Sequence, residues 1–208
     1  MEGRALGGRF IVITGPMFSG KTSRLLEFLE REQLANNSIM LFKPDIDNRY
    51  TDSAKGEAAA NGIPNGHVYS HKMLHMPAEL IPIGGVGGEM IRSKAEGIKA
   101  VGVDEAQFFT PEAKIPETLE QLANAGTHVY VSMLNKDHRG GVFGISADML
   151  TRADMIYSLS AVCRKCGSDN ATLTQKVING KEVFGEQVEV GGKDLYEPRC
   201  RDCFVREK

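Results

Sequence analysis

Residues 15–22, which read Gly-Pro-Met-Phe-Ser-Gly-Lys-Thr, decide the fold of this chain. They fit the pattern G-x-x-x-x-G-K-[ST], whose glycines let the backbone turn tightly so that several N–H groups point into one concavity. The run Phe-Ile-Val-Ile-Thr at 10–14 comes just before and predicts a short buried strand. Leucines from position 25 onward fit one side of a helix that ends near Ala35. The motif therefore lies in the strand–loop–helix context that a phosphate-binding loop requires.

This loop predicts a site for a nucleoside triphosphate and a divalent cation. The start of the following helix adds the positive end of its dipole to the backbone N–H groups. We expect Lys21 to meet the β- and γ-phosphates and Thr22 to offer its hydroxyl to Mg²⁺. The alternative is a chance glycine-rich turn, which the strand, helix, lysine and threonine together disfavour. The expected ATP-binding residues are Gly15, Pro16, Met17, Phe18, Ser19, Gly20, Lys21 and Thr22.

The order of apolar runs and helical stretches predicts an α/β fold. Strand, helix and strand follow one another over 10–42, and such a unit favours a parallel sheet. Residues 115–125 add a helix that Gly126 ends. We therefore expect a RecA-like phosphate-loop fold with a parallel sheet flanked by helices. The expected strands cover 10–14, 39–42, 100–103, 129–134 and 155–159.

Two segments interrupt this pattern. Residues 43–71 are polar and contain several glycines and prolines, which predicts a long loop. Residues 84–88 read Gly-Gly-Val-Gly-Gly and predict a flexible joint. His67, His71 and His75 would share one face of a helix and suit a metal there, but we favour surface or partly buried histidines.

Two acidic residues follow the expected strand at 100–103. In a phosphate-loop fold, a carboxylate at such a strand end lies at the crevice where ligands bind. We expect Asp104 to hold Mg²⁺, directly or through water, and Glu105 to accept the proton of an attacking hydroxyl. Taken alone, a solvated acidic pair is the simpler interpretation, but the phosphate loop favours the functional one. The stretch Asp-Glu-Ala-Gln also matches the D-E-A-x box of nucleic-acid helicases, although a helicase core needs two phosphate-loop domains.

Four cysteines form two C-x-x-C pairs near the end of the sequence. Two such pairs place four thiolates around one tetrahedral Zn²⁺, and a site filled by four protein ligands is structural. Buried free cysteines and a redox pair are the alternatives. We expect a phosphate-loop domain over 1–160 and a zinc-stapled module over 161–208 that contains a β-rich stretch at 183–190. The expected zinc ligands are Cys163, Cys166, Cys200 and Cys203.

Charge and hydropathy narrow the class of partner. The 208 residues include 25 Lys and Arg against 27 Asp and Glu, a net charge of −2. A broad surface for nucleic acid or anionic membrane usually needs a basic excess, so we expect neither partner. No run approaches the roughly 18 apolar residues of a membrane span. The opening Met-Glu-Gly-Arg lacks the layout of a signal peptide, so we expect a cytoplasmic protein.

Several stretches together resemble the zinc-containing (type II) thymidine kinases of cells and bacteria. The resemblance covers about residues 10–204. Besides the phosphate loop, the stretches that carry it are Asp47-Asn-Arg-Tyr50, Asp104-Glu-Ala-Gln-Phe-Phe109, Phe143-Gly144, Ala161-Val-Cys-x-x-Cys166, Val190-Gly-Gly-x-x-x-Tyr196 and Cys200-x-x-Cys203.

The resemblance implies transfer of the γ-phosphoryl group of ATP to the 5′-hydroxyl of thymidine or deoxyuridine, which serves nucleotide salvage for DNA synthesis. It implies that Glu105 is the general base, that Asp104 is associated with Mg²⁺, and that Arg49 helps Lys21 to hold phosphate. It also implies a homotetramer inhibited by the end product dTTP.

The resemblance further implies an apolar thymine pocket covered by a zinc-fixed "lasso" segment that binds the base largely through backbone groups. The departures from the family pattern are Asn135 and His138, where the family has an aspartate and an aromatic residue, and we expect a looser pocket wall at His138. The matching pocket residues are Met17, Phe108, Leu134, Phe143, Thr174, Val188, Glu189, Val190, Gly191 and Tyr196.

Two other functions stay open at this point. An apolar pocket does not encode thymine, so a nucleoside kinase with another base preference is one of them. A zinc-ribbon DEAQ-type ATPase that acts on nucleic acid is the other, and its turnover would respond to DNA or RNA with a strong salt dependence.

Overall fold

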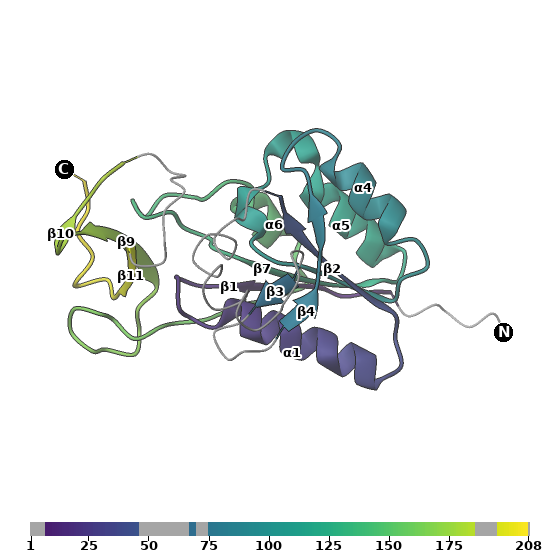
Figure 1. The fold of residues 1–208 in the computed structure, drawn as a ribbon, viewed down its shortest axis with the longest axis horizontal. Helices are drawn as coiled ribbons and strands as arrows, with labels where there is room; N and C mark the ends of the chain where they lie inside the picture. Colours follow the sequence, from purple (N-terminus) through teal and green to yellow (C-terminus); the bar gives the residue numbers. More distant parts are fainter. Residues whose placement is uncertain (1–6, 46–66, 70–74, 186–194, 208) are drawn as a thin grey trace.

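A computed structural model describes residues 7–45, 67–69, 75–185 and 195–207 (Figure 1). Its centre is a six-stranded sheet in the order β5-β2-β6-β7-β1-β8, and every neighbouring pair is parallel. The predicted parallel α/β fold is confirmed. The strands of this sheet are β1 (Phe10–Thr14), β2 (Ile39–Pro44), β5 (Glu79–Ile81), β6 (Ala100–Val103), β7 (His128–Met133) and β8 (Met155–Ser158).

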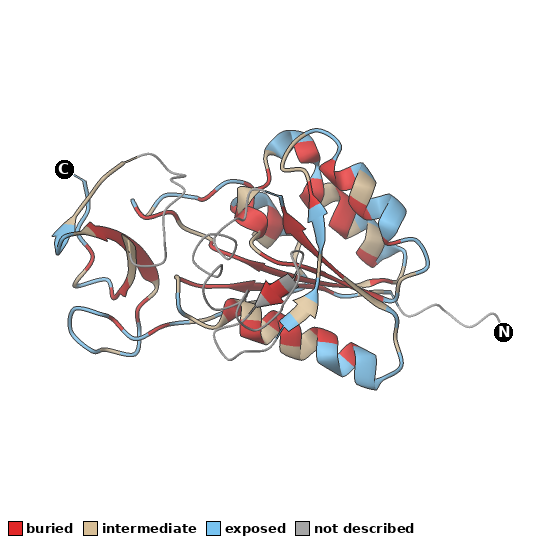
Figure 2. Ribbon diagram, in the orientation of Figure 1, coloured by how far each residue is buried: buried red, intermediate tan, exposed pale blue. Residues whose placement is uncertain are grey.

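Helices cover both faces of this sheet. Helix α1 (Lys21–Leu34) lies on one face, and α4 (Gly87–Lys94), α5 (Ile115–Asn124) and α6 (Ser146–Arg152) lie on the other (Figure 1). Side chains alternate along each strand between the two helical layers, so the sheet has an apolar core on each side. Its central strands are buried along almost their whole length (Figure 2). This explains the continuous apolar runs that marked the strands in the sequence.

The α1 face contains a buried polar link between helix and sheet. Glu32 of α1 accepts hydrogen bonds from the Tyr130 hydroxyl of β7 and from Asn37 Nδ2, the latter at 2.6 Å. Burial and the bond to Glu32 raise the pKa of Tyr130, so the phenol stays protonated at neutral pH. The Phe28 ring stacks on the Tyr130 ring at 5.1 Å. These contacts fix the angle at which α1, and with it the phosphate loop, meets the sheet.

A separate three-stranded antiparallel sheet lies at one end of the molecule, on the left in Figure 1. Its strands are β9 (Leu173–Ile178), β10 (Lys181–Glu182) and β11 (Tyr196–Arg199), with β9 in the centre. The prediction of a β-rich stretch over 183–190 is wrong for its described part, 183–185, which forms no strand, and 186–190 lies outside the described residues. The sequence does not predict the central strand β9, because its buried middle, Thr174-Gln175-Lys176, is polar.

The glycine-rich segment 84–88 is not a joint. It forms a tight turn that leads into the first turn of α4, where Gly87 and Gly88 are buried. A Cβ on Gly87 would lie 2.6 Å from the Pro82 carbonyl oxygen, and one on Gly88 would lie 2.5 Å from that of Ala113. These glycines permit close packing rather than motion.

The predicted loop over 43–71 is shorter than expected at both ends. Lys43 and Pro44 complete β2, while β3 (His67–Tyr69) pairs with β4 (His75–Pro77) in an antiparallel ribbon. His67 and His75 therefore belong to strands and not to one helix face. Residues 46–66, and His71, lie outside the described residues.

Candidate active site

The phosphate loop leaves β1 and enters α1 through left-handed backbone conformations. Gly20, the residue before α1, has φ 85°, and no side chain caps the helix N-terminus. A Cβ on Gly15 would lie 2.5 Å from the Leu159 carbonyl oxygen, so this position too requires glycine. Lys21 is only 7% exposed, and its ammonium donates to the Pro16 carbonyl at 2.8 Å. The loop thus presents uncapped N–H groups and a cation on one side, an arrangement that suits phosphate.

A hydroxyl–carboxylate cluster adjoins this loop. Asp104 is 4% exposed at the carboxyl end of β6. Thr22 Oγ1, at the start of α1, donates to it and lies 3.2 and 3.3 Å from its two carboxylate oxygens. The hydroxyl of Ser132, on the intervening strand β7, also donates to Asp104. Three oxygen-bearing side chains from separate elements converge here, and hard oxygen donors are the ligands that Mg²⁺ prefers.

Glu105 follows directly and has an unusual backbone. Its φ and ψ are 54° and 40°, a left-handed conformation that costs free energy in a residue with a Cβ. The short helix η1 (Ala106–Phe108) begins after it. This turn directs Asp104 and Glu105 differently: Asp104 lies buried against Thr22, while Glu105 is half-buried and bonds to Gln107 Nε2.

The segments that meet around Gln107 carry three aromatic or apolar side chains. Phe108 and Phe143 meet edge to face with ring centroids 5.7 Å apart. Leu134, which follows β7, is 6% exposed, and Phe143 is exposed to the same fraction. Phe108 remains partly accessible. These side chains have the apolar character expected of a base pocket.

The three-stranded sheet reaches the phosphate loop through Thr174. The Met17 backbone N–H donates to Thr174 Oγ1 at 3.0 Å, which joins residues 157 positions apart. The predicted pocket residues Met17 and Thr174 therefore lie together, at the junction of the two sheets.

His138, where we expect a looser pocket wall, is a buried residue. Its side chain is 2% exposed. The centroids of the His138 and Tyr196 rings lie 6.1 Å apart, and His138 Nε2 accepts a hydrogen bond from the Gly185 N–H at 3.5 Å. Burial lowers the pKa of His138 despite the opposing carboxylate of Asp137, so the ring is neutral at pH 7. A neutral imidazole packs as an aromatic ring would.

Five predicted site residues lie outside the described residues. They are Arg49, Val188, Glu189, Val190 and Gly191.

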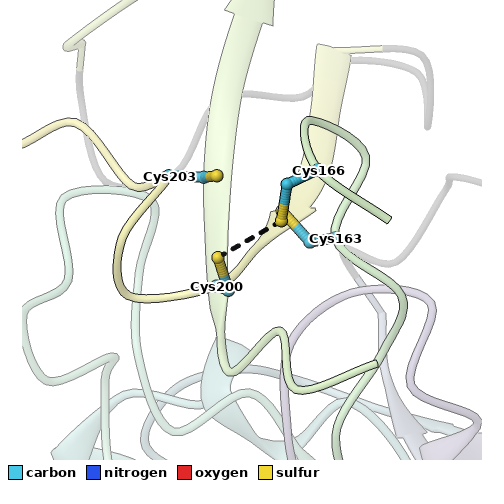
Figure 3. Close-up of side chains that lie close together, drawn as sticks. All are labelled: Cys163, Cys166, Cys200 and Cys203. Carbon is cyan, nitrogen blue, oxygen red and sulfur yellow. Dashed lines mark hydrogen bonds between the residues drawn. The ribbon is translucent and has the colours of Figure 1, made fainter. Parts of the chain in front are cut away.

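The four cysteines form one cluster (Figure 3). Their sulfur atoms all lie within 4.8 Å of one another, and Cys166 Sγ is 3.7 Å from Cys200 Sγ. Thiolates bound at about 2.3 Å to a tetrahedral Zn²⁺ are separated by about 3.8 Å, so this cluster fits zinc. Burial raises the pKa of Cys163, but hydrogen bonds from the backbone N–H groups of Cys200, Cys166 and Lys165 and from the Cys166 thiol together outweigh burial and lower the pKa to about 6. The backbone thus already favours a thiolate at this position.

A surface cavity of about 720 Å³ lies elsewhere, between the ends of α4 and α5. Lys99 and Thr127 in its wall precede β6 and β7, so it is at the amino edge of the parallel sheet. Ligands of such folds bind at the carboxyl edge, where the phosphate loop is.

Comparisons with known proteins agree with this geometry. The family model described as thymidine kinase matches residues 8–204. The chain belongs to the thymidine kinase family. Relatives named thymidine kinase include that of Thermococcus kodakarensis, 39% identical over 94% of this chain and 93% of its own length. The protein of that name from Pyrobaculum aerophilum is also 39% identical, over 94% of this chain and 97% of its own. The thymidine kinase of Deinococcus deserti is 37% identical over 94% of this chain and 93% of its own length.

Family membership confirms the resemblance inferred from the sequence and with it an ATP-dependent nucleoside kinase. The alternative, an ATPase that acts on nucleic acid, finds no support. In the described part of the chain, no helix is long and apolar enough to cross a membrane.

Two polar residues of the site had no role in the sequence analysis. Ser132 interrupts an apolar strand, and a polar residue at a buried strand position is the signal that could have revealed it. Gln107 stood inside the Asp-Glu-Ala-Gln stretch, but nothing in the sequence identifies its two hydrogen-bond partners.

Proposed function

We propose that this kinase transfers the γ-phosphoryl group of ATP to the 5′-hydroxyl of thymidine or deoxyuridine, giving the monophosphate for nucleotide salvage. The observation that carries the proposal is the convergence of Thr22 and Asp104, within 3.2 and 3.3 Å, with Glu105 next in the chain. A phosphate loop, a cation site and a candidate base thereby meet at one edge of the sheet.

The triphosphate binds to residues 15–22. Backbone N–H groups of the loop and of the start of α1 donate hydrogen bonds to its phosphate oxygens, and Lys21 offsets the charge on the β- and γ-phosphates. Thr22 and Asp104 would hold Mg²⁺, which supplies charge stabilisation for the transferring group. Ser132 keeps the Asp104 carboxylate oriented toward Thr22.

Glu105 acts as the general base. It orients the 5′-hydroxyl in line with the γ-phosphorus and accepts its proton as the new P–O bond forms and the bond to ADP breaks. Arg49 offsets charge on the transferring group. Phosphoryl transfer depends mainly on the positioning of the reactants and on the stabilisation of charge. Because Asp104 and Glu105 are adjacent in the chain, the residue that holds the cation and the residue that orients the hydroxyl are kept close together.

The thymine base lies against Leu134, Phe108 and Phe143, with Met17 and Thr174 at its edge. Residues 161–208 act as a module that covers the base, with backbone groups of 188–191 as its contacts. Zinc held by the four cysteines would fix the ends of this module, because metal binding stabilises folded structure around its ligands. Covering the nucleoside also excludes water and limits futile ATP hydrolysis.

The family resemblance adds three further parts to the proposal: a homotetramer, feedback inhibition by dTTP, and a location in the cytoplasm. Support for a subunit interface comes from β8, an edge strand of the large sheet on which Met155 and Ile156 are exposed. An apolar edge strand of this kind is normally covered.

A nucleoside screen tests the reaction. The protein is incubated with ATP, Mg²⁺ and each natural nucleoside or deoxynucleoside in turn, and monophosphate formation is followed by chromatography. We expect thymidine and deoxyuridine to be converted and Lys21→Met to abolish conversion. Conversion of a purine nucleoside in preference to thymidine would contradict the base assignment. ATP turnover that needs DNA or RNA would contradict the kinase.

A further inference from the structure

Gln107 joins the candidate base to the nucleoside pocket. It is 1% exposed within the short helix η1. Its Nε2 donates to Glu105 Oε2 at 2.5 Å, and its Oε1 accepts from the Leu134 backbone N–H at 2.9 Å. One side chain therefore connects the carboxylate after β6 with the loop after β7.

The amide can adopt only one orientation here. The Leu134 N–H is a donor and needs an acceptor, so the amide oxygen of Gln107 must face it. The NH₂ group is then directed at Glu105, where it donates to an ionised carboxylate. Rotation of the amide by half a turn would break both bonds at once.

The rest of this turn is equally constrained. A Cβ on Gly144, which has φ 51°, would lie 2.2 Å from the Gln107 carbonyl oxygen, so the 134–144 loop packs directly on the η1 backbone. Phe108 and Phe143 add a ring contact between the same two segments. Contacts with the loop that carries Leu134 and Phe143 thus help to hold the strained backbone at Glu105.

We propose that Gln107 is a positioning residue that holds the Glu105 carboxylate in register with the base pocket. The inference rests on the proposed function, in which Glu105 receives the 5′-hydroxyl proton. A base bound against Leu134 and Phe143 then sets the distance between the 5′-hydroxyl oxygen and the Glu105 carboxylate. Nucleosides with different bases should therefore differ in kcat as well as in binding affinity.

Two substitutions test this role. Gln107→Met keeps the length of the side chain but removes both hydrogen bonds. Gln107→Glu keeps an acceptor for Leu134 and replaces only the donor that faces Glu105. We expect each to lower kcat about 10- to 100-fold, the effect of a misplaced reacting group, and to leave the KM for thymidine within about threefold.

Gln175 provides the matched control. It is also fully buried, and its Oε1 accepts a backbone N–H, that of Val205, at 2.8 Å. It has no carboxylate partner among the hydrogen bonds of the described residues. Gln175→Met is expected to reduce thermal stability while kcat stays within about twofold, which separates loss of a buried amide from loss of positioning.

A double-mutant cycle with Glu105→Gln gives the decisive readout. If Gln107 acts through Glu105, Gln107→Met lowers kcat in the wild-type background but changes it by less than about twofold in Glu105→Gln. Equal, additive losses in both backgrounds would overturn the proposal, as would a loss confined to KM or to thermal stability. Failure of the proposed function looks different: Glu105→Gln alone would keep its kcat, or the wild-type protein would not phosphorylate thymidine. If Gln107→Met does not fold, Gln107→Glu carries the same cycle.

Discussion

At the scale of single residues, Asp104 shows how the site depends on its neighbours. Two hydroxyls donate to its buried carboxylate, one from Thr22 at the start of α1 and one from Ser132 on β7. Both of these donors are neutral hydroxyl groups. Ser132 takes no part in the proposed chemistry and serves to orient Asp104.

Ser132→Ala should therefore weaken Mg²⁺ binding more than catalysis. We expect the Mg²⁺ concentration for half-maximal rate to rise about tenfold, within the range found when a residue behind a metal ligand is lost. The rate at saturating Mg²⁺ should stay within about threefold of wild type. Thr118→Val, which removes a buried hydroxyl from α5, is the control and should change neither value. An unchanged Mg²⁺ requirement in Ser132→Ala would show that Ser132 does not orient a metal ligand.

The sequence predicted the site residues that a motif identifies. The phosphate loop, the acidic pair and the cysteine pairs have fixed spacings, because each chemistry needs its groups on one short segment. Gln107 and Ser132 have partners 27 and 28 positions away, Leu134 and Asp104. No spacing rule links such residues, since the folded sheet alone brings their strands together.

At the scale of elements, the start of α4 differs most from the sequence prediction. Composition alone indicated a flexible joint, since Gly-Gly-Val-Gly-Gly is typical of linkers. The described structure has the last two of these glycines inside a helix, packed on Ala113 and Thr118. A glycine needed for motion and a glycine needed for close approach look the same in a sequence.

Alanine substitutions in the 84–88 segment distinguish a flexible joint from a closely packed helix start. A Cβ on Gly88 would lie 2.5 Å from the Ala113 carbonyl oxygen, whereas nothing lies within 4 Å of a Cβ on Gly85. We expect Gly88→Ala to lower the free energy of unfolding by about 1–3 kcal/mol, the usual cost of overpacking. Gly85→Ala should stay within about 0.5 kcal/mol of wild type. Chemical denaturation measures both, and equal small effects would indicate that the segment is a loose joint after all.

The strands of the large sheet were predicted closely because burial on both faces makes them continuously apolar. The strand β9 was missed, since Gln175 and Lys176 are polar although fully buried. Its backbone pairs with β10 and β11, and the side-chain oxygen of Gln175 accepts a hydrogen bond from the Val205 N–H at 2.8 Å. Such a strand has no hydrophobic periodicity to detect.

At the scale of the whole molecule, two sheets meet at one site. The large sheet supplies the phosphate loop, Asp104 and Glu105, while the small one supplies Thr174 and Tyr196. The link from Met17 to Thr174 and the ring contact between His138 and Tyr196 cross this junction. Nucleoside binding should therefore depend on the small sheet more strongly than ATP binding does.

Metal removal tests this division. We expect the purified protein to contain one Zn²⁺ per chain by elemental analysis. Cys200→Ser, or removal of zinc with a chelator, should weaken thymidine binding at least about tenfold, because the metal stabilises the structure around the base. ATP affinity should change by less than about threefold. Zinc added back to the chelated protein should restore thymidine binding, and undiminished thymidine binding without metal would contradict the role of the cluster.

The central claim is that the phosphate loop and the Glu105 carboxylate act on one transferring phosphoryl group. The most direct test is kcat for thymidine phosphorylation by Glu105→Gln, measured beside its thymidine dissociation constant. The amide has nearly the shape of the carboxylate but accepts no proton, so we predict a loss of about 10²- to 10⁴-fold in kcat with thymidine binding within about threefold of wild type. Near-normal turnover by Glu105→Gln would contradict the account.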